Sequence, residues 1–279
     1  MIDRSETTQM ISVIIEPEAT DTETAERILQ RFRPSANDSS KNIENTEKEQ
    51  EDHETSKLVL KLGADGLSLH SDGQVLKGDF TRMLPRLKSS NLSKELLVRA
   101  AKIKDSDAPL TALDATAGLG EDSLLLAAAG FHVTLYERNP VVYELLFDTI
   151  KRAKNIPELS KIVSRMQVIH EDSIEAMKHL KSSPDVILLD PMFPERQKSA
   201  LVKKKLQMIQ KLEIPCMDET ELLKTAMNAK PKKLIVKRPP KGPYLAGIKP
   251  DYSNEGKAVR FDCFVSPYDR IQKFKFDER

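Results

Sequence analysis

The segment Asp190-Pro191-Met192-Phe193-Pro194 follows the apolar run Val186-Ile187-Leu188-Leu189 and precedes a group of lysines. A carboxylate at the end of a buried strand can accept hydrogen bonds from a planar amine, and an aromatic ring gives a flat base a surface on which to stack. The exocyclic amine of a nucleobase is a poor nucleophile, because its lone pair is delocalised into the ring. Acceptors aimed at its hydrogens and a fixed approach to a methyl donor would both lower the barrier. We therefore predict that Asp190, Pro191 and Phe193 are catalytic residues of an N-methylation site.

A second candidate site is the loop Asp114-Ala115-Thr116-Ala117-Gly118-Leu119-Gly120, which connects a predicted strand to a predicted helix. Gly118 and Gly120 allow a sharp turn and a close approach of the backbone to a ligand. Glu137 ends the next predicted strand, where its carboxylate could accept hydrogen bonds from both hydroxyls of a ribose. This pattern predicts a nucleoside-containing cofactor.

The residues after the glycines distinguish between two kinds of cofactor. A dinucleotide-binding loop would have a third glycine where Ser123 stands, and a helix start free of negative charge. Glu121 and Asp122 occupy that helix start instead, and they would repel a diphosphate. They suit a ligand with a sulfonium and an amino group, which favours S-adenosylmethionine.

A third acidic position follows the third predicted strand, at Asp172-Ser173. In this architecture either side chain could hydrogen-bond the amino group of an adenine. Asp172 could equally cap the helix that begins at Ser173, and the two roles are compatible.

The charge distribution along the chain is uneven, although the net charge is only +1. Residues 1–57 contain 14 acidic and 7 basic residues, whereas residues 196–241 contain 13 basic and 4 acidic ones. A basic half that begins directly after the Asp-Pro turn indicates a polyanionic partner such as RNA. The predicted phosphate contacts are Arg196, Lys198, Lys203, Lys204, Lys237 and Arg238.

Alternating apolar strands and amphipathic helices position these residues. Strands are predicted at 111–116, 132–137, 166–170, 186–190 and 233–237, with helices between them and a final antiparallel hairpin that ends in the strand 258–265. This pattern predicts a doubly wound, mostly parallel α/β sheet of the Rossmann-like class.

Upstream of this domain we predict a small α+β subdomain. Residues 11–16 form a predicted strand, residues 22–32 a helix, and residues 57–80 a small antiparallel sheet. Residues 35–56 lack apolar periodicity and are predicted to be a disordered acidic linker. The predicted boundaries are therefore 1–90 for the N-terminal subdomain and 91–279 for the larger domain.

Composition excludes several classes of protein. An apolar run of about 18 residues or more, the length of a membrane span, is absent, and the N-terminus has no signal-peptide pattern, so we expect a cytoplasmic protein without a membrane partner. Cys216 and Cys263 have no neighbouring Cys or His at ligand spacing, so we expect neither a disulfide nor a metal site.

Several motifs resemble one family closely. They are D-A-T-A-G-L-G (114–120), E-R-N-P-V-V (137–142), D-P-M-F-P-E-R-Q-K-S-A-L-V-K-K (190–204), V-K-R-P (236–239) and R-F-D-C-F (260–264). Together they are similar to the bacterial 16S ribosomal RNA guanine-N2 methyltransferases of the RsmJ type, over roughly residues 58–267. The resemblance implies an S-adenosylmethionine-dependent class I methyltransferase that forms N2-methylguanosine in small-subunit rRNA.

By motif position, the resemblance also implies cofactor contacts at Glu121, Asp122, Glu137, Arg138, Asp172, Ser173 and Asp190. With the loop residues Asp114, Gly118 and Gly120, these complete the predicted cofactor site. Glu121 stands where we expect the family to have a basic residue.

Two alternatives remain open from the sequence. Similar Asp-Pro-x-Phe turns serve methylation of other nucleobases and of small amines, so the acceptor could differ while the cofactor stays the same. The chain could also be a noncatalytic RNA-binding assembly factor that has kept the fold. Cofactor affinity and the identity of the methylated product would distinguish these possibilities.

Overall fold

A computed structural model describes residues 11–32, 58–104, 109–191 and 219–273 of the chain. The chain forms two compact units, Met1–Lys77 and Gly78–Arg279. The predicted acidic linker lies outside the described residues.

The first unit contains a four-stranded sheet in the order β1-β2-β3-β4. Its elements are β1 (Ile11–Ile15), α1 (Thr22–Arg31), β2 (Leu58–Gly63), β3 (Gly66–Ser71) and β4 (Gln74–Leu76). Strand β1 pairs in parallel with β2, and the remaining pairs are antiparallel. Every second residue of β2 is buried, beginning at Leu58, and Ile28 of α1 is fully buried, as an amphipathic helix packed on a sheet requires.

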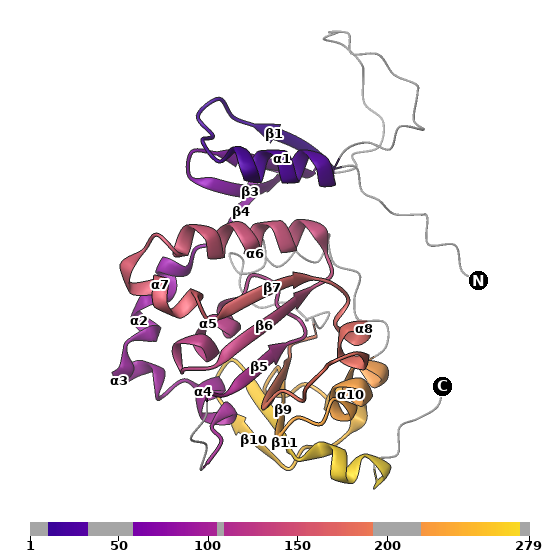
Figure 1. The fold of residues 1–279 in the computed structure, drawn as a ribbon. Helices are drawn as coiled ribbons and strands as arrows, with labels where there is room; N and C mark the ends of the chain where they lie inside the picture. Colours follow the sequence, from indigo (N-terminus) through magenta and orange to yellow (C-terminus); the bar gives the residue numbers. More distant parts are fainter. Residues whose placement is uncertain (1–10, 33–57, 105–108, 192–218, 274–279) are drawn as a thin grey trace, which may run out of the picture. The chain divides into compact units, whose positions relative to one another are not determined.

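The second unit contains a seven-stranded sheet in the order β10-β11-β9-β8-β5-β6-β7 (Figure 1). The strands are β5 (Thr111–Asp114), β6 (His132–Glu137), β7 (Met166–His170), β8 (Val186–Leu189), β9 (Lys233–Arg238), β10 (Tyr252–Glu255) and β11 (Arg260–Val265). Strands β5 to β9 run parallel, whereas β11 is antiparallel to both of its neighbours. The order reverses between β5 and β8, which is where open α/β sheets bind their ligands.

The helices of this unit are α2 (Leu84–Leu87), α3 (Ser89–Leu92), α4 (Leu96–Ala101), α5 (Glu121–Ala128), α6 (Pro140–Ala153), α7 (Pro157–Val163), α8 (Ser173–Lys178) and α10 (Glu219–Asn228). Short 3-10 segments occur at Phe80–Met83, Leu245–Gly247 and Pro267–Lys273. Helices α2 and α3 precede the first strand of this unit and have no counterpart in the prediction.

The sheet is covered on both faces, which gives three layers (Figure 1). One core cluster joins alternate strand residues such as Leu188 and Ile235 to side chains of α4, α5, α6 and α7. The other joins the intervening strand residues, such as Leu189 and Val236, to α8 and α10. The predicted doubly wound, mostly parallel α/β fold is therefore confirmed. Within the described ranges, each helix is too short or too polar to cross a lipid bilayer.

Candidate active site at the carboxyl ends of the parallel strands

The predicted site residues gather along one edge of the large sheet. Strands β6, β5, β8 and β9 are parallel neighbours, so their carboxyl ends meet at the same edge. Glu137 ends β6, the glycine loop follows β5, Asp190 follows β8, and Lys237 lies near the end of β9. We call this edge the rim.

The glycine loop adopts a backbone conformation that favours glycine. Gly118 and Gly120 have φ values of +52° and +76°. A Cβ atom at Gly120 would lie 2.6 Å from Cδ1 of Leu146 on α6, so a side chain there would displace Leu146 as well as strain the backbone. A Cβ at Gly118 would meet no described atom within 4 Å, so this part of the loop faces open space that a ligand can enter.

Glu137 fastens the loop to the end of β6. Its Oε2 accepts a 3.0 Å hydrogen bond from the backbone N–H of Gly118, and its Oε1 accepts a 2.8 Å bond from that of Asn139. The residue is only 6% exposed, and desolvation raises its pKa despite these two bonds. Each carboxylate oxygen keeps a second lone pair. The group can therefore hold the loop and still accept hydrogen bonds from two hydroxyls.

Asp114 lies beneath the loop. Its Oδ2 accepts a 2.6 Å hydrogen bond from the Ser123 hydroxyl, and its Oδ1 accepts a 3.1 Å bond from the backbone N–H of Thr116. Burial raises the pKa of Asp114 to about 7, although both hydrogen bonds act in the opposite direction. Ser123 therefore has a specific structural function in the place where a dinucleotide-binding loop would have glycine.

Asp190 is held at its backbone by the glycine loop. Its N–H donates a 2.6 Å hydrogen bond to Oγ1 of Thr116, which connects the turn after β8 to the loop after β5. The carboxylate of Asp190 is 39% exposed, and its Oδ2 lies 2.8 Å from Nζ of Lys237. Desolvation raises the pKa of Asp190, Lys237 opposes this shift, and Asp122 adds to it.

Asp122 belongs to the same cluster because it lies in the first turn of α5. Its Oδ2 is 2.6 Å from Nζ of Lys237. Desolvation lowers the pKa of Lys237, but the carboxylates of Asp122 and Asp190 more than offset this effect and raise it. Glu121, the preceding residue, is exposed.

Arg138, Asp172 and Ser173 lie at the ends of β6 and β7. Asp172 caps α8 by accepting a 2.8 Å hydrogen bond from the backbone N–H of Ile174, and its Oδ2 lies 3.8 Å from Nη1 of Arg138. The predicted capping role of Asp172 is therefore confirmed. Ser173 is the first residue of α8 and is partly exposed.

Other predicted residues are placed differently or lie outside the described residues. Arg238 is 1% exposed, and its Nε donates to the backbone oxygen of Pro243, so its predicted phosphate contact has no support in this arrangement. Lys237 is engaged by two carboxylates, as described above. Pro191 is described and buried. The candidates outside the described residues are Phe193, Arg196, Lys198, Lys203 and Lys204.

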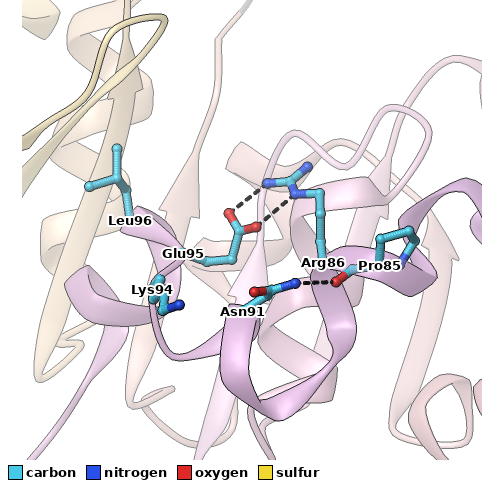
Figure 2. Close-up of a pocket in the computed structure, with 6 residues that line it drawn as sticks. All are labelled: Pro85, Arg86, Asn91, Lys94, Glu95 and Leu96. Carbon is cyan, nitrogen blue, oxygen red and sulfur yellow. Dashed lines mark hydrogen bonds and ion pairs between the residues drawn. The ribbon is translucent and has the colours of Figure 1, made fainter.

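A shallow pocket of about 350 Å³ lies where α2, α3 and α4 meet (Figure 2). Arg86 and Glu95 point toward each other there and form two 2.8 Å hydrogen bonds, and the Asn91 side chain donates to the backbone oxygen of Pro85. Hydrogen bonds to the Glu95 carboxylate raise the pKa of Arg86, and the charges of Asp122 and Glu121 contribute to the shift.

Comparisons with known proteins agree with this geometry. A family model described as SAM-dependent methyltransferase (SAM_MT) matches residues 42–266. A curated relative from Nitrosococcus oceani, named ribosomal RNA small subunit methyltransferase J, is 39% identical over 215 residues, which covers 75% of this chain and 84% of the relative. A relative of the same name from Thioalkalivibrio sulfidiphilus is 40% identical over 217 residues, covering 75% and 85%.

A solved structure extends the similarity to the fold. The crystal structure of a SAM-dependent methyltransferase from Neisseria gonorrhoeae is 31% identical in sequence, with a TM-score of 0.67, and the match covers 91% of this chain and 96% of that one. The fold and the rim thus define an S-adenosylmethionine-dependent methyltransferase. More specifically, the chain belongs to the family of the ribosomal RNA small subunit methyltransferase J enzymes, and its cofactor is S-adenosylmethionine. The resemblance noted from the motifs is confirmed.

The chemistry of the rim fits this cofactor. Glu137 offers acceptors for ribose hydroxyls, the backbone at Gly118 faces open space, and the carboxylates of Asp122 and Asp190 complement positive charge. Thr116 was not singled out by sequence reasoning. It is the last residue of the predicted strand 111–116, but the turn that it contacts comes 74 residues later in the chain.

Proposed function

We propose that this protein methylates the exocyclic N2 of a guanine in small-subunit (16S) ribosomal RNA. The observation that carries the proposal is Asp190, whose carboxylate is partly exposed on the rim and whose backbone N–H is hydrogen-bonded to Thr116 of the glycine loop. The names of the relatives, each covered over more than four fifths of its length, support rRNA as the substrate.

S-adenosylmethionine supplies an electrophilic methyl group attached to a sulfonium. We propose that Glu137 binds the ribose, that the backbone of Gly118 and Gly120 lies against the cofactor, and that Asp172 and Ser173 lie beside the adenine. Asp122 lies at the start of α5 and Arg138 follows the end of β6, and both positions border this site. Asp114 fixes the glycine loop through its hydrogen bonds with Ser123 and Thr116.

The acceptor side of the reaction depends on Asp190. Its carboxylate accepts a hydrogen bond from the guanine amine, and the backbone oxygen of Pro191 is the second acceptor in this proposal. Two acceptors favour the pyramidal nitrogen whose lone pair is directed at the methyl carbon. Formation of the new N–C bond would be matched by cleavage of the bond between sulfur and the methyl carbon, which leaves a neutral thioether, and the nitrogen would lose one proton to the Asp190 carboxylate or to water. Phe193, outside the described residues, is proposed to stack on the base.

The RNA must present an unpaired or flipped-out guanine to reach this rim, at a cost of a few kcal/mol. We propose that the exposed Lys88 and Lys94, at and beside the α2–α4 pocket, contact phosphates close to the rim. This surface adds to the basic segment after Pro194 that the sequence predicts.

A methyl-transfer assay tests the proposal. The protein is incubated with labelled S-adenosylmethionine and small ribosomal subunits that lack the modification, and the rRNA is digested to nucleosides. Label in N2-methylguanosine is expected. Label in N6-methyladenosine would reject guanine as the acceptor, and absence of both cofactor binding and transfer would favour a noncatalytic assembly factor.

A further inference from the structure

Lys237 is directed toward Asp190 by the geometry of two neighbouring strands. Strands β8 and β9 are parallel with Leu189 paired to Val236, so the next residues, Asp190 and Lys237, are neighbours at the strand ends. Side chains alternate along a strand, so Lys237 shares the face of Ile235, and Asp190 shares the face of Leu188. Both of those apolar residues pack in the core cluster that includes α5.

Helix α5 supplies the third member of this cluster. Asp122 lies in its first turn and approaches the same amine, so that Nζ of Lys237 is 2.6 Å from Oδ2 of Asp122 and 2.8 Å from Oδ2 of Asp190. The Lys237 side chain is only 25% exposed. A cation that is held between two carboxylates and mostly covered is poorly placed to contact a phosphate.

We infer that Lys237 is a positioning residue for methyl transfer, which fixes the Asp190 carboxylate beside the cofactor-side residue Asp122. This inference rests on the proposed function, because it takes Asp190 as the acceptor for the guanine amine. It replaces the predicted role of Lys237 in RNA binding.

The ion pair with the Lys237 amine fixes the orientation of the Asp190 carboxylate. Lys237 engages Oδ2 of Asp190, and among the described residues Oδ1 receives no hydrogen bond. Oδ1 is therefore the oxygen available to the substrate amine. Without Lys237, the carboxylate could rotate, and its two oxygens would no longer be distinguished.

The charges around Asp190 show why a cation is needed there. Asp122 approaches from α5 and Asp114 from β5, whereas Lys237 and Arg238 approach from β9. Desolvation and Asp122 raise the pKa of Asp190, and Lys237 is the foremost group that opposes this rise. Loss of Lys237 would shift the pKa of Asp190 upward, so a larger share of the protein would carry a protonated carboxyl that cannot accept at both oxygens.

The test compares Lys237→Met, Lys237→Gln and Lys237→Arg with Lys232→Met as a control. Lys232 pairs with Asp185 at 2.7 Å at the opposite end of β9, so this variant loses a similar ion pair away from the rim. In the neutral Lys237 variants, the acidic limb of the kcat-pH profile is expected to move upward by about one pH unit or more, with recovery of kcat at alkaline pH. For Lys237→Arg and Lys232→Met, the acidic limb of the kcat-pH profile should lie at the same pH as in the unmodified protein.

A second measurement is independent of activity. Carbon-13 NMR titration of the Asp190 carboxyl in the cofactor-free protein should give a higher pKa in whichever neutral Lys237 variant is folded, as judged by circular dichroism. If the proposed function failed, this titration would still show whether Lys237 lowers the pKa of Asp190, so the two failures can be distinguished. An unchanged pKa of Asp190, or a raised KM for rRNA with an unshifted kcat-pH profile, would overturn it.

Discussion

Oγ1 of Thr116 accepts a 2.6 Å hydrogen bond from the backbone N–H of Asp190, and this bond joins the cofactor loop to the turn that carries the proposed acceptor. The two residues belong to segments that follow neighbouring parallel strands, β5 and β8. A change in one segment is therefore transmitted directly to the other.

We predict that Thr116→Val lowers kcat by about 10-fold, because an unsatisfied, partly buried N–H costs roughly 1–3 kcal/mol and releases the turn at Asp190. Thr116→Ser retains the hydroxyl acceptor, so its kcat should remain close to that of the unmodified protein. Single-turnover kinetics with saturating cofactor would measure the effect. Equal rates for Thr116→Val and the unmodified protein would show that this bond does not position Asp190.

Glu137→Gln should weaken S-adenosylmethionine binding by about 10- to 100-fold, the range that corresponds to losing a hydrogen bond to a charged acceptor. The amide nitrogen cannot accept from a hydroxyl, and it would also face one of the two backbone N–H groups that the carboxylate now holds. Isothermal titration calorimetry gives the affinity. Glu158→Gln, the same change at an exposed position on α7, is the matched control and should bind normally.

Asp114→Asn should change how stability depends on pH. The folded-state pKa of Asp114, about 7, lies above the ordinary value of 3.8, so between these values the folded protein holds a proton that the unfolded chain has lost. The free energy of unfolding therefore falls as pH rises through this window. The asparagine variant does not lose this stability, because its side chain does not titrate. Relative to the unmodified protein, it should gain roughly 2–3 kcal/mol between pH 5 and pH 8.

Denaturant unfolding at the two pH values measures this change. Asp185→Asn is the control, because hydrogen bonds from Lys232 and Thr111 lower the pKa of Asp185 despite its desolvation, so that its titration lies below the window. Its stability difference from the unmodified protein should be the same at pH 5 and pH 8. A constant difference for Asp114→Asn as well would mean that Asp114 is already ionised at pH 5.

The double variant Lys88→Glu/Lys94→Glu should raise the KM for rRNA. The slope of the logarithm of the binding constant against the logarithm of salt concentration should become shallower by about two, one for each lost phosphate contact. Cofactor affinity should be unchanged. Lys181→Glu, an exposed lysine before β8 at the opposite end of that strand from Asp190, makes the same kind of charge change away from the rim. An unaltered salt slope in the double variant would show that Lys88 and Lys94, at and beside the α2–α4 pocket, do not contact RNA phosphates.

Much of the fold was predictable because its signals are local. The apolar runs that become β5, β6 and β8 end at recognisable polar residues, so Glu137 and Asp190 could be assigned to strand ends from the sequence alone. The glycines of the loop likewise indicated a sharp turn, and both have positive φ values.

The pairing of side chains across the rim was not predictable in this way. The position of Lys237 between Asp122 and Asp190 depends on the register of β8 with β9 and on the face that each side chain takes. One residue later, Arg238 points to the opposite face, where Glu219 lies 3.6 Å from its guanidinium and the side chain is buried. A run of basic residues therefore looked uniform in sequence, although the fold assigns its members different environments.

The short helices α2 and α3 were missed for a different reason. Each spans four residues, which is too short for apolar periodicity to be recognised. Asn91 and Glu95 stabilise this region through contacts with Pro85 and Arg86, which are local in space but lack a sequence signature.

Nucleoside mass spectrometry of 16S rRNA, from cells that lack the gene and are complemented with variants, tests the central claim most directly. The account predicts that one N2-methylguanosine disappears without the gene, returns with the unmodified protein, and stays absent with an Asp190→Ala protein that is folded and binds S-adenosylmethionine. Full restoration of the methyl group by Asp190→Ala, or an rRNA methylation pattern that is unchanged without the gene, would contradict it.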